Sequence, residues 1–327
     1  MVFLSGIQAN QLRIYDNPMN NRAIDLFILV DETTSRLTPV QFGQIKITVK
    51  NIVTDLQPGS STPYFGVYFY GSTSSVDTVV PFGSNSATTV SKNVDLKQYT
   101  ATQLNPSSLS AALDSVNAAC HTSCREKISR VTVIFTSSPD LAAEARIRQL
   151  EDNFGMTVII VGIGSGITTS VLQKLASHPT DEYGLPFSSF TELIVSTSLI
   201  SFLISNVPRV VSVGEQLSLT STVAGAYYTV QVNTKAFIRT NDTVVTFTTN
   251  CIECLVYSSL SKTNPTNANA IATTNPQYFY APGYTYPVYY FRIPQNTNRF
   301  YFSFLGTGMT SVTGIFNVFD MPQMMTF

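Results

Sequence analysis

The sequence predicts an α/β domain with a doubly wound, mostly parallel sheet, followed by an all-β sandwich. Over the first two thirds of the 327 residues, continuous apolar runs alternate with segments of helical periodicity. Strands separated by helices at this rhythm are typical of a parallel sheet with helices on both faces. Beyond Pro208 short alternating segments punctuated by Asn, Pro and Gly take over, which is typical of a sandwich. We therefore expect two domains, at residues 22–207 and 208–327.

The elements of the first domain follow from apolar spacing. Residues 25–30 (DLFILV) carry a continuous apolar run, which is typical of a strand covered on both faces. The segment 38–56 places Val40, Ile45 and Val49 at helical spacing and is an expected helix. The other expected elements are strands at 64–71, 76–83, 130–138 and 156–164 and helices at 107–120, 143–155, 168–177 and 188–207.

The second domain is expected to consist of about seven short strands. Their alternating segments lie at 216–223, 227–233, 243–250, 254–260, 286–294, 299–306 and 314–321. Residues 262–277 form one long polar loop between two of them.

Composition limits the classes of partner. The formal net charge is -1 and only 12% of residues are charged, against about a quarter in typical soluble domains. Lys and Arg form no basic stripe, which excludes a nucleic-acid partner. Ser, Thr, Asn and Tyr are expected to fill the surface instead. This balance, with 16 Tyr, 21 Phe and no Trp, indicates a neutral, polar, β-rich exterior, and we expect a secreted, extracellular protein.

The four cysteines form two close pairs, Cys120 with Cys124 and Cys251 with Cys254. Two local disulfides in an oxidising compartment explain this spacing best, while free thiols and a metal site remain alternatives. Redox catalysis by the second pair would need a helix N-terminus, and its flanks are expected to be strands.

The chain start, MVFLSGIQANQ, lacks the charged and apolar regions of a signal peptide. The longest apolar stretch, Leu193–Val207, is interrupted by Ser and Thr and is too short to span a bilayer comfortably. We expect no transmembrane segment. Asn241, in Asn-Asp-Thr, is the one acceptor pattern for N-glycosylation.

Polar oxygens gather directly after the first expected strand. Asp31 directly follows the run DLFILV, and Thr33 and Ser35 stand two and four positions after Asp31. Ligands of open α/β sheets bind where the carboxyl ends of strands meet the loops. Carboxylate and hydroxyl oxygens on one turn suit a hard cation such as Mg²⁺, Ca²⁺ or Mn²⁺. The alternative is that Asp31 caps the helix that follows.

This arrangement resembles the von Willebrand factor type A domain, or integrin I domain, whose first strand ends in Asp-x-Ser-x-Ser. The resemblance covers about residues 22–207 and implies a metal-ion-dependent adhesion site formed by Asp31, Thr33 and Ser35. In that family a Thr before a later helix adds an oxygen ligand. Ser107 in NPSSLSAAL is the matching position, with Ser108 as second choice and helix capping as the alternative role.

The sequence departs from the family at one ligand. An Asp is expected after the strand VTVIFTSS, but Ser137 stands there and the nearest acid is Asp140. Losing a carboxylate removes a negative charge beside the ion, so metal binding is expected to be weak or absent. Glu32 is expected to be solvated, as are the isolated His121 and His178.

Enzyme patterns are missing from the sequence. The glycines of VGIGSGI lack the spacing and partner acid of a phosphate-binding fingerprint. There is no GxSxG elbow and no HExxH, and two histidines without a pattern do not make a hydrolase triad. We expect a protein that is not an enzyme.

Three functions follow as hypotheses. The first is a secreted adhesion or recognition protein that binds an extracellular protein through the degenerate metal site. The second is a structural component of an extracellular assembly or matrix with a decayed site, where aromatic side chains supply self-assembly interfaces. The third is carbohydrate binding by sandwich tyrosines such as Tyr278, Tyr280, Tyr284 and Tyr286. The sandwich resembles CUB-like or pre-peptidase-like domains, and the pairing is similar to nematode secreted proteins.

Overall fold

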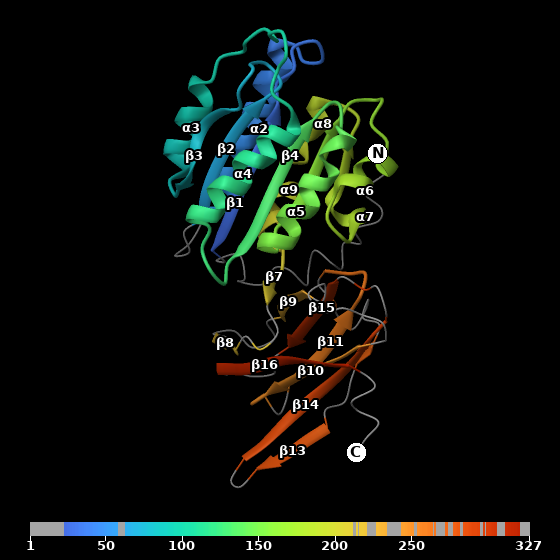
Figure 1. The fold of residues 1–327 in the computed structure, drawn as a ribbon. Coiled ribbons are helices and arrows are strands. Elements are labelled where there is room, and N and C mark those ends of the chain that lie inside the picture. The colour runs from blue at the N-terminus through green and yellow to red at the C-terminus, as the bar shows by residue number, and fades with distance from the viewer. Residues whose placement is uncertain are drawn as a thin grey trace. The chain divides into compact units, whose positions relative to one another are not determined.

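The chain divides into two compact units, one ending at Arg209 and the other beginning at Val210. Their helices and strands are labelled in Figure 1. The computed structural model describes residues 23–57, 63–211, 214, 216–220, 227–233, 243–251, 254–263, 265, 272–273, 277–281, 284–294, 297, 299–305 and 311–320.

A six-stranded sheet forms the centre of the first unit. Its strands are β1 (Ile24–Asp31), β2 (Tyr64–Tyr70), β3 (Asp77–Ser84), β4 (Ser129–Thr136), β5 (Thr157–Ile163) and β6 (Gly184–Phe187). They are arranged in the order β3-β2-β1-β4-β5-β6. Neighbouring strands are parallel except for β2 and β3, which are antiparallel. The mostly parallel sheet that the sequence predicts is therefore confirmed.

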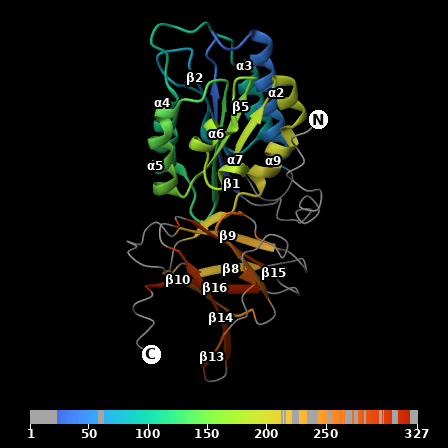
Figure 2. The same ribbon diagram turned by 90° about the vertical axis from the view of Figure 1, so that its right-hand side faces the viewer.

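Helices cover both faces of this sheet. They are α2 (Pro39–Asp55), α3 (Ala87–Leu96), α4 (Leu109–Ser123), α5 (Glu144–Phe154), α6 (Thr169–Leu175), α7 (Thr180–Tyr183), α8 (Phe190–Val195) and α9 (Thr197–Ser205), with the 3-10 turn η2 at Leu141–Ala143. In Figure 2, α4 and α5 lie on one side of the strands and α2 and α9 on the other. The sheet is thus wound on both faces.

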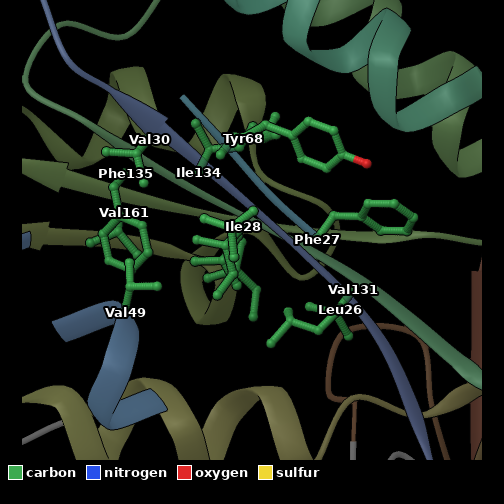
Figure 3. Close-up of a cluster of buried hydrophobic side chains, with 14 of the residues drawn as sticks. Leu26, Phe27, Ile28, Val30, Val49, Tyr68, Val131, Ile134, Phe135 and Val161 are labelled. Carbon is green, nitrogen blue, oxygen red and sulfur yellow. The ribbon is translucent and has the colours of Figure 1, made fainter. Parts of the chain in front are cut away.

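β1 lies in the middle of the core. All eight of its residues are buried, because a parallel strand with helices on both faces has no solvent-facing side. Side chains of β1 gather with those of β2, β4 and β5 and with Val49 of α2 in Figure 3. This burial explains why DLFILV reads as a run rather than as an alternation.

α2 begins at a capping box. Oγ1 of Thr38 accepts a hydrogen bond from the backbone N–H of Gln41 (3.3 Å), and Oε1 of Gln41 accepts one from the N–H of Thr38 (2.8 Å). Pro39 occupies the first helical turn, where a missing N–H costs nothing. Val40 is 72% exposed and therefore lies outside the buried face of α2, which begins at Phe42 and includes Ile45 and Val49.

Two helical segments differ from the expectation. α3 was not predicted, because its three buried residues, Ala87, Val90 and Val94, are spaced among Thr, Ser and Asn, which are poor helix formers. The helix expected at 188–207 is divided at Ser196 into α8 and α9. Within the described residues, no helix is long and apolar enough to cross a membrane.

The second unit is all β. Its strands are β7 (Arg209–Val211), β8 (Gln216–Thr220), β9 (Tyr227–Asn233), β10 (Thr243–Thr249), β11 (Leu255–Ser259), β12 (Ala272–Thr273), β13 (Gln277–Ala281), β14 (Tyr284–Ile293), β15 (Arg299–Leu305) and β16 (Ser311–Asp320). They form two five-stranded sheets, β13-β14-β10-β16-β8 and β12-β11-β15-β9-β7. The rings of Phe247 on β10 and Phe302 on β15 lie 4.7 Å apart, so the two sheets share a core.

Both local disulfides are formed. Cys120 in the last turn of α4 is bonded to Cys124, which caps that helix, and Cys251 is bonded to Cys254. No cysteine is free. The pairing that the spacing favours is confirmed.

Some predictions fall on parts of the chain outside the description. Asn241 and the chain start, residues 1–22, lie outside the described residues, as does most of the expected polar loop at 262–277. The side chains of four tyrosines also lie outside them: Tyr278, Tyr280, Tyr284 and Tyr286. Glycosylation and carbohydrate binding therefore stay predictions.

Candidate functional site

The candidate site lies at the carboxyl end of β1. β1 is flanked in the sheet by β2 and β4, and the chain connections run outward from it in opposite directions. Open α/β sheets bind ligands at such a switch point. Asp31 is the last residue of β1, and it is 3% exposed.

The carboxylate of Asp31 accepts three hydrogen bonds. Oδ1 accepts from the backbone N–H of Thr33 (3.1 Å) and from its hydroxyl (2.6 Å). Oδ2 accepts from the hydroxyl of Thr136 at the end of β4 (3.0 Å). A carboxylate has about four acceptor positions, so one remains. The cap of α2 is Thr38 rather than Asp31, and the capping alternative for Asp31 is therefore wrong.

Ser107 and Ser108 have separate roles. Oγ of Ser108 accepts a hydrogen bond from the N–H of Ala111 (3.2 Å), which makes Ser108 the cap of α4. Ser107 is 7% exposed, and its hydroxyl oxygen accepts from the N–H of Gly71 (3.2 Å). Ser107 is therefore not the helix cap, and its hydroxyl lies against the turn that follows β2.

Gly71 brings the predicted ligands together. Its φ is +94°, and a Cβ added there would overlap the hydroxyl of Thr33 and lie 3.0 Å from Oδ1 of Asp31. Its N–H meanwhile contacts Ser107. Asp31, Thr33 and Ser107 thus surround one backbone position that only glycine fits. Ser35 is exposed on the same loop, so it is the predicted ligand that this cluster leaves out.

The departure from the family pattern is visible after β4. The hydroxyl oxygen of Ser137 is buried and has no hydrogen-bond partner among the described residues. Oδ1 of Asp140 accepts from the N–H of Ala142 (3.0 Å) and caps η2. Asp140 therefore has a local role of its own, and Ser137 leaves an unsatisfied polar atom at the position where a carboxylate was expected.

Thr136 and Tyr70 are site residues that sequence reasoning missed. Burial raises the pKa of Tyr70 well above its usual range, and the negative charge of Asp31 raises it further, while a hydrogen bond with Thr136 lowers it. Asp31 therefore lies beside a phenol that stays neutral. A Thr at the end of a buried strand next to β1 is the signal that could have pointed to Thr136.

Glu32 is buried, contrary to the expectation that it is solvated. It is 1% exposed, and Oε1 accepts from the hydroxyl of Ser72 and from Nζ of Lys97 (3.0 Å). Burial raises the pKa of Glu32, although the hydrogen bonds from Ser72 and Lys97 lower it. Burial also lowers the pKa of Lys97, but hydrogen bonds with Asp77 and Glu32 outweigh that effect and the pKa is raised. The Lys97 ammonium also lies 3.0 Å from Oε2 of Glu32, so both carboxylate oxygens contact it.

The donor set fits a weakly held hard dication. One carboxylate with a remaining acceptor position and two hydroxyl oxygens, from Thr33 and Ser107, surround Gly71, and Mg²⁺, Ca²⁺ and Mn²⁺ prefer oxygen ligands. The described residues contain no group of three His, Cys, Asp or Glu side chains able to hold a metal. A low ligand charge is consistent with low affinity.

Comparison with solved structures gives two kinds of similar protein. Proximal thread matrix protein 1 from the mussel byssus, with a zinc-occupied MIDAS motif, is 17% identical over 63% of this chain and 51% of that chain, with a TM-score of 0.49. A second structure of that protein is 18% identical over 62% and 50%, with a TM-score of 0.48. A von Willebrand factor type A protein from Catenulispora acidiphila is 11% identical over 92% and 63%, with a TM-score of 0.45. The chain spans about half the length of the mussel structures that it matches.

The family assignment comes from the sequence itself. No curated protein matches the chain. The model of the von Willebrand factor type A domain matches residues 25–197, which is more than half of the 327 residues. The matched region contains Asp31, Thr33 and Ser107, whereas the likeness of the second unit to CUB-like domains and to nematode secreted proteins stays a prediction. The chain belongs to the von Willebrand factor type A domain family.

Proposed function

We propose that this chain is a secreted, non-enzymatic recognition protein that binds an extracellular protein partner through a weak dication site at the carboxyl end of β1. Asp31, Thr33 and Ser107 would hold the ion, with Ser35 as an exposed fourth oxygen. The type A domain, residues 22–207, carries this site, and residues 208–327 form a separate domain. The two disulfides support an oxidising compartment.

The cluster around Gly71 carries the proposal. The carboxylate of Asp31 and the hydroxyl of Thr33 on one loop, and the hydroxyl of Ser107 on another, surround Gly71, whose φ is positive. A buried carboxylate without a cationic side chain in hydrogen-bond contact is costly. Among the described residues, Asp31 accepts hydrogen bonds from hydroxyl and amide donors alone. A dication when bound supplies an electrophilic centre at which a partner's carboxylate completes the coordination. Because the site supplies a single carboxylate, it would neutralise only part of the dication's charge, and the remaining positive charge would attract the partner's carboxylate.

A calorimetric titration tests this proposal. Mg²⁺ and Mn²⁺ titrated into the protein should bind at millimolar or lower concentrations, and Asp31→Asn should abolish binding. Asp140→Asn is the matched control, because it removes a carboxylate that caps η2 and should leave ion binding intact. Absence of ion binding by the wild-type protein at millimolar concentration contradicts the proposal.

A partner test follows the ion test. This chain is immobilised and exposed to extracellular fluid. A partner protein should be retained in Mg²⁺, released by chelator and retained again when Mg²⁺ is restored. The Asp31→Asn variant should retain no partner. Retention that is indifferent to all three changes contradicts recognition through the ion.

A structural component of an extracellular assembly is the second candidate. It is favoured by the contacts of Asp31, whose two oxygens are already hydrogen-bonded by Thr33 and Thr136, so that the loop can hold its shape without an ion. In that case the thermal stability and the oligomeric state should be the same in chelator and in Mg²⁺. Thermal denaturation in both buffers separates the two functions, because only a protein that binds the ion is stabilised by Mg²⁺, and analytical ultracentrifugation then measures whether the chain self-assembles.

A further inference from the structure

The loop that carries Ser107 is attached to the rest of the site at several points. It runs from Lys97, the cap of α3, to Ser108, the cap of α4. Along it, the N–H of Gln103 donates to the carbonyl of Ser72 (2.7 Å) and the N–H of Ser107 to the carbonyl of Thr73 (2.6 Å). The second half of the loop is thus fixed to the turn after β2.

The middle of the loop is joined to the Asp31 loop by two threonines. The N–H of Thr34 donates to Oγ1 of Thr102 (2.8 Å), and the N–H of Thr102 donates to Oγ1 of Thr34 (2.9 Å). This reciprocal contact fixes the distance between the two loops at Thr34 and Thr102, while the start of the 97–108 loop has separate contacts.

Lys97 holds that start. Its side chain is 7% exposed, and Nζ lies 3.0 Å from each carboxylate oxygen of Glu32 and 2.9 Å from Oδ2 of Asp77. The ammonium also lies 5.5 Å from the ring centre of Phe69 on β2. A buried ammonium with these partners has one defined position.

Glu32 connects this ion pair to the site. Glu32 follows Asp31 directly in the chain, and its carboxylate also accepts a hydrogen bond from the hydroxyl of Ser72. The backbone carbonyl of Ser72 in turn accepts from the N–H of Gln103. Lys97, at the start of the 97–108 loop, and Ser72, in the turn after β2, therefore both donate to the carboxylate of Glu32. Buried ion pairs add little stability compared with apolar contacts, and their best-attested use is to fix one arrangement among several.

We propose that Lys97 is a positioning residue for the Asp31–Thr33–Ser107 site, and that its ion pair with Glu32 sets the place of the 97–108 loop and hence of the Ser107 hydroxyl. This inference rests on the proposed function. Residues that orient metal ligands from outside the coordination sphere change metal affinity by about 10–100-fold when they are replaced. Loss of the Lys97–Glu32 pair should act in that range.

The test removes both charges together, because replacing Lys97 alone leaves Glu32 buried without its partner, which is strongly destabilising. The variant is Glu32→Gln with Lys97→Met, in which the amide can still accept from Ser72. Calorimetry should show Mn²⁺ affinity at least about tenfold lower than in the wild type. Hydrogen exchange should be about tenfold faster at the Gln103 and Ser107 amides.

Two control variants isolate the effect. Lys50→Met breaks an exposed ion pair with Asp95 (2.7 Å) on the neighbouring helices and should change neither readout. Val94→Ala makes a cavity in α3 and lowers stability without touching the pair, so its Mn²⁺ affinity should stay within about twofold of the wild type. An equal loss in Val94→Ala would mean that stability, not position, sets affinity and would overturn the inference.

The two readouts separate the failures. If the wild type binds no ion, the proposed function fails, while exchange at Gln103 and Ser107 still decides whether Lys97 positions the loop. If the wild type binds Mn²⁺ and the double variant binds equally well, Lys97 is not a positioning residue even though the recognition site stands. Unchanged exchange at both amides overturns the inference in either case.

Discussion

The hydroxyl of Thr136 donates a 3.0 Å hydrogen bond to Oδ2 of Asp31, across 105 positions of sequence. Both residues end parallel strands, and the pairing of Val30 with Phe135 places these ends side by side. The register of β1 and β4 therefore places the hydroxyl of Thr136 within hydrogen-bond reach of Asp31. The site is built on rigid elements at this point, and its loops are attached to them.

Replacing Thr136 tests this contact. Thr136→Val keeps the shape of the side chain but removes the donor to Oδ2 of the buried Asp31 carboxylate and the oxygen that accepts from the N–H of Ser138 (3.0 Å). Such a loss costs about 1–3 kcal/mol, which a shift of the urea midpoint would measure. Thr136→Ser retains the hydroxyl and should stay closer to the wild type. A valine variant as stable as the wild type would mean that the bond contributes nothing.

Gly71 offers a matched comparison with another glycine of positive φ. Alanine in a left-handed conformation costs about 1–2 kcal/mol, and Gly83→Ala (φ +106°), where no atom lies within 4 Å of the added Cβ, should show only that cost. Gly71→Ala must also displace Thr33 and approach Asp31. We expect the larger loss of stability for Gly71→Ala, together with loss of ion binding. Equal stabilities by thermal denaturation would contradict the close approach.

Ser137 provides a gain-of-function test. Ser137→Asp places a second carboxylate near Asp31, which should strengthen Mg²⁺ binding by about tenfold or more because ligand charge sets affinity. Without an ion the two like charges repel, so the variant should be less stable than the wild type in chelator and more stable in Mg²⁺. Ser137→Asn, of the same shape but uncharged, should show neither effect. A variant whose melting temperature ignores Mg²⁺ would place Ser137 outside the site.

The fold could be predicted further than the site. β1 was recognisable because a strand buried on both faces needs a continuous apolar run, and α2 because Thr38, Pro39 and Gln41 supply local capping signals. α3 was missed because its apolar residues are few and because it packs against α2 and β3, which no local pattern reveals. Local sequence signals were enough to predict β1 and α2, whereas α3 depends on contacts with segments that are distant in the sequence.

Within the site, the sequence pointed to Asp31 and Thr33 because they share one turn. It misjudged Glu32 because burial of that carboxylate depends on Lys97, 65 positions away. It left Ser107 open between two roles, and the role of cap went to Ser108 because only the Ser108 hydroxyl meets the first free N–H groups of α4. Partners that are distant in sequence set these outcomes.

The start of α8 gives a pH prediction with a definite sign. Glu192 accepts hydrogen bonds from the hydroxyl (2.6 Å) and N–H (2.7 Å) of Ser188, and these bonds lower its pKa from the usual 4.5. A carboxyl group whose pKa is lower in the folded protein stabilises the fold above its unfolded pKa, and this contribution is lost as the pH falls through the folded value. The free-energy difference between the wild type and Glu192→Gln should therefore be largest near neutral pH and shrink below about pH 4. Glu126→Gln removes the same charge at an exposed position and serves as the control. Urea unfolding from pH 7 to pH 3 measures both, and parallel curves for wild type and Glu192→Gln would show that these hydrogen bonds do not favour the charged form.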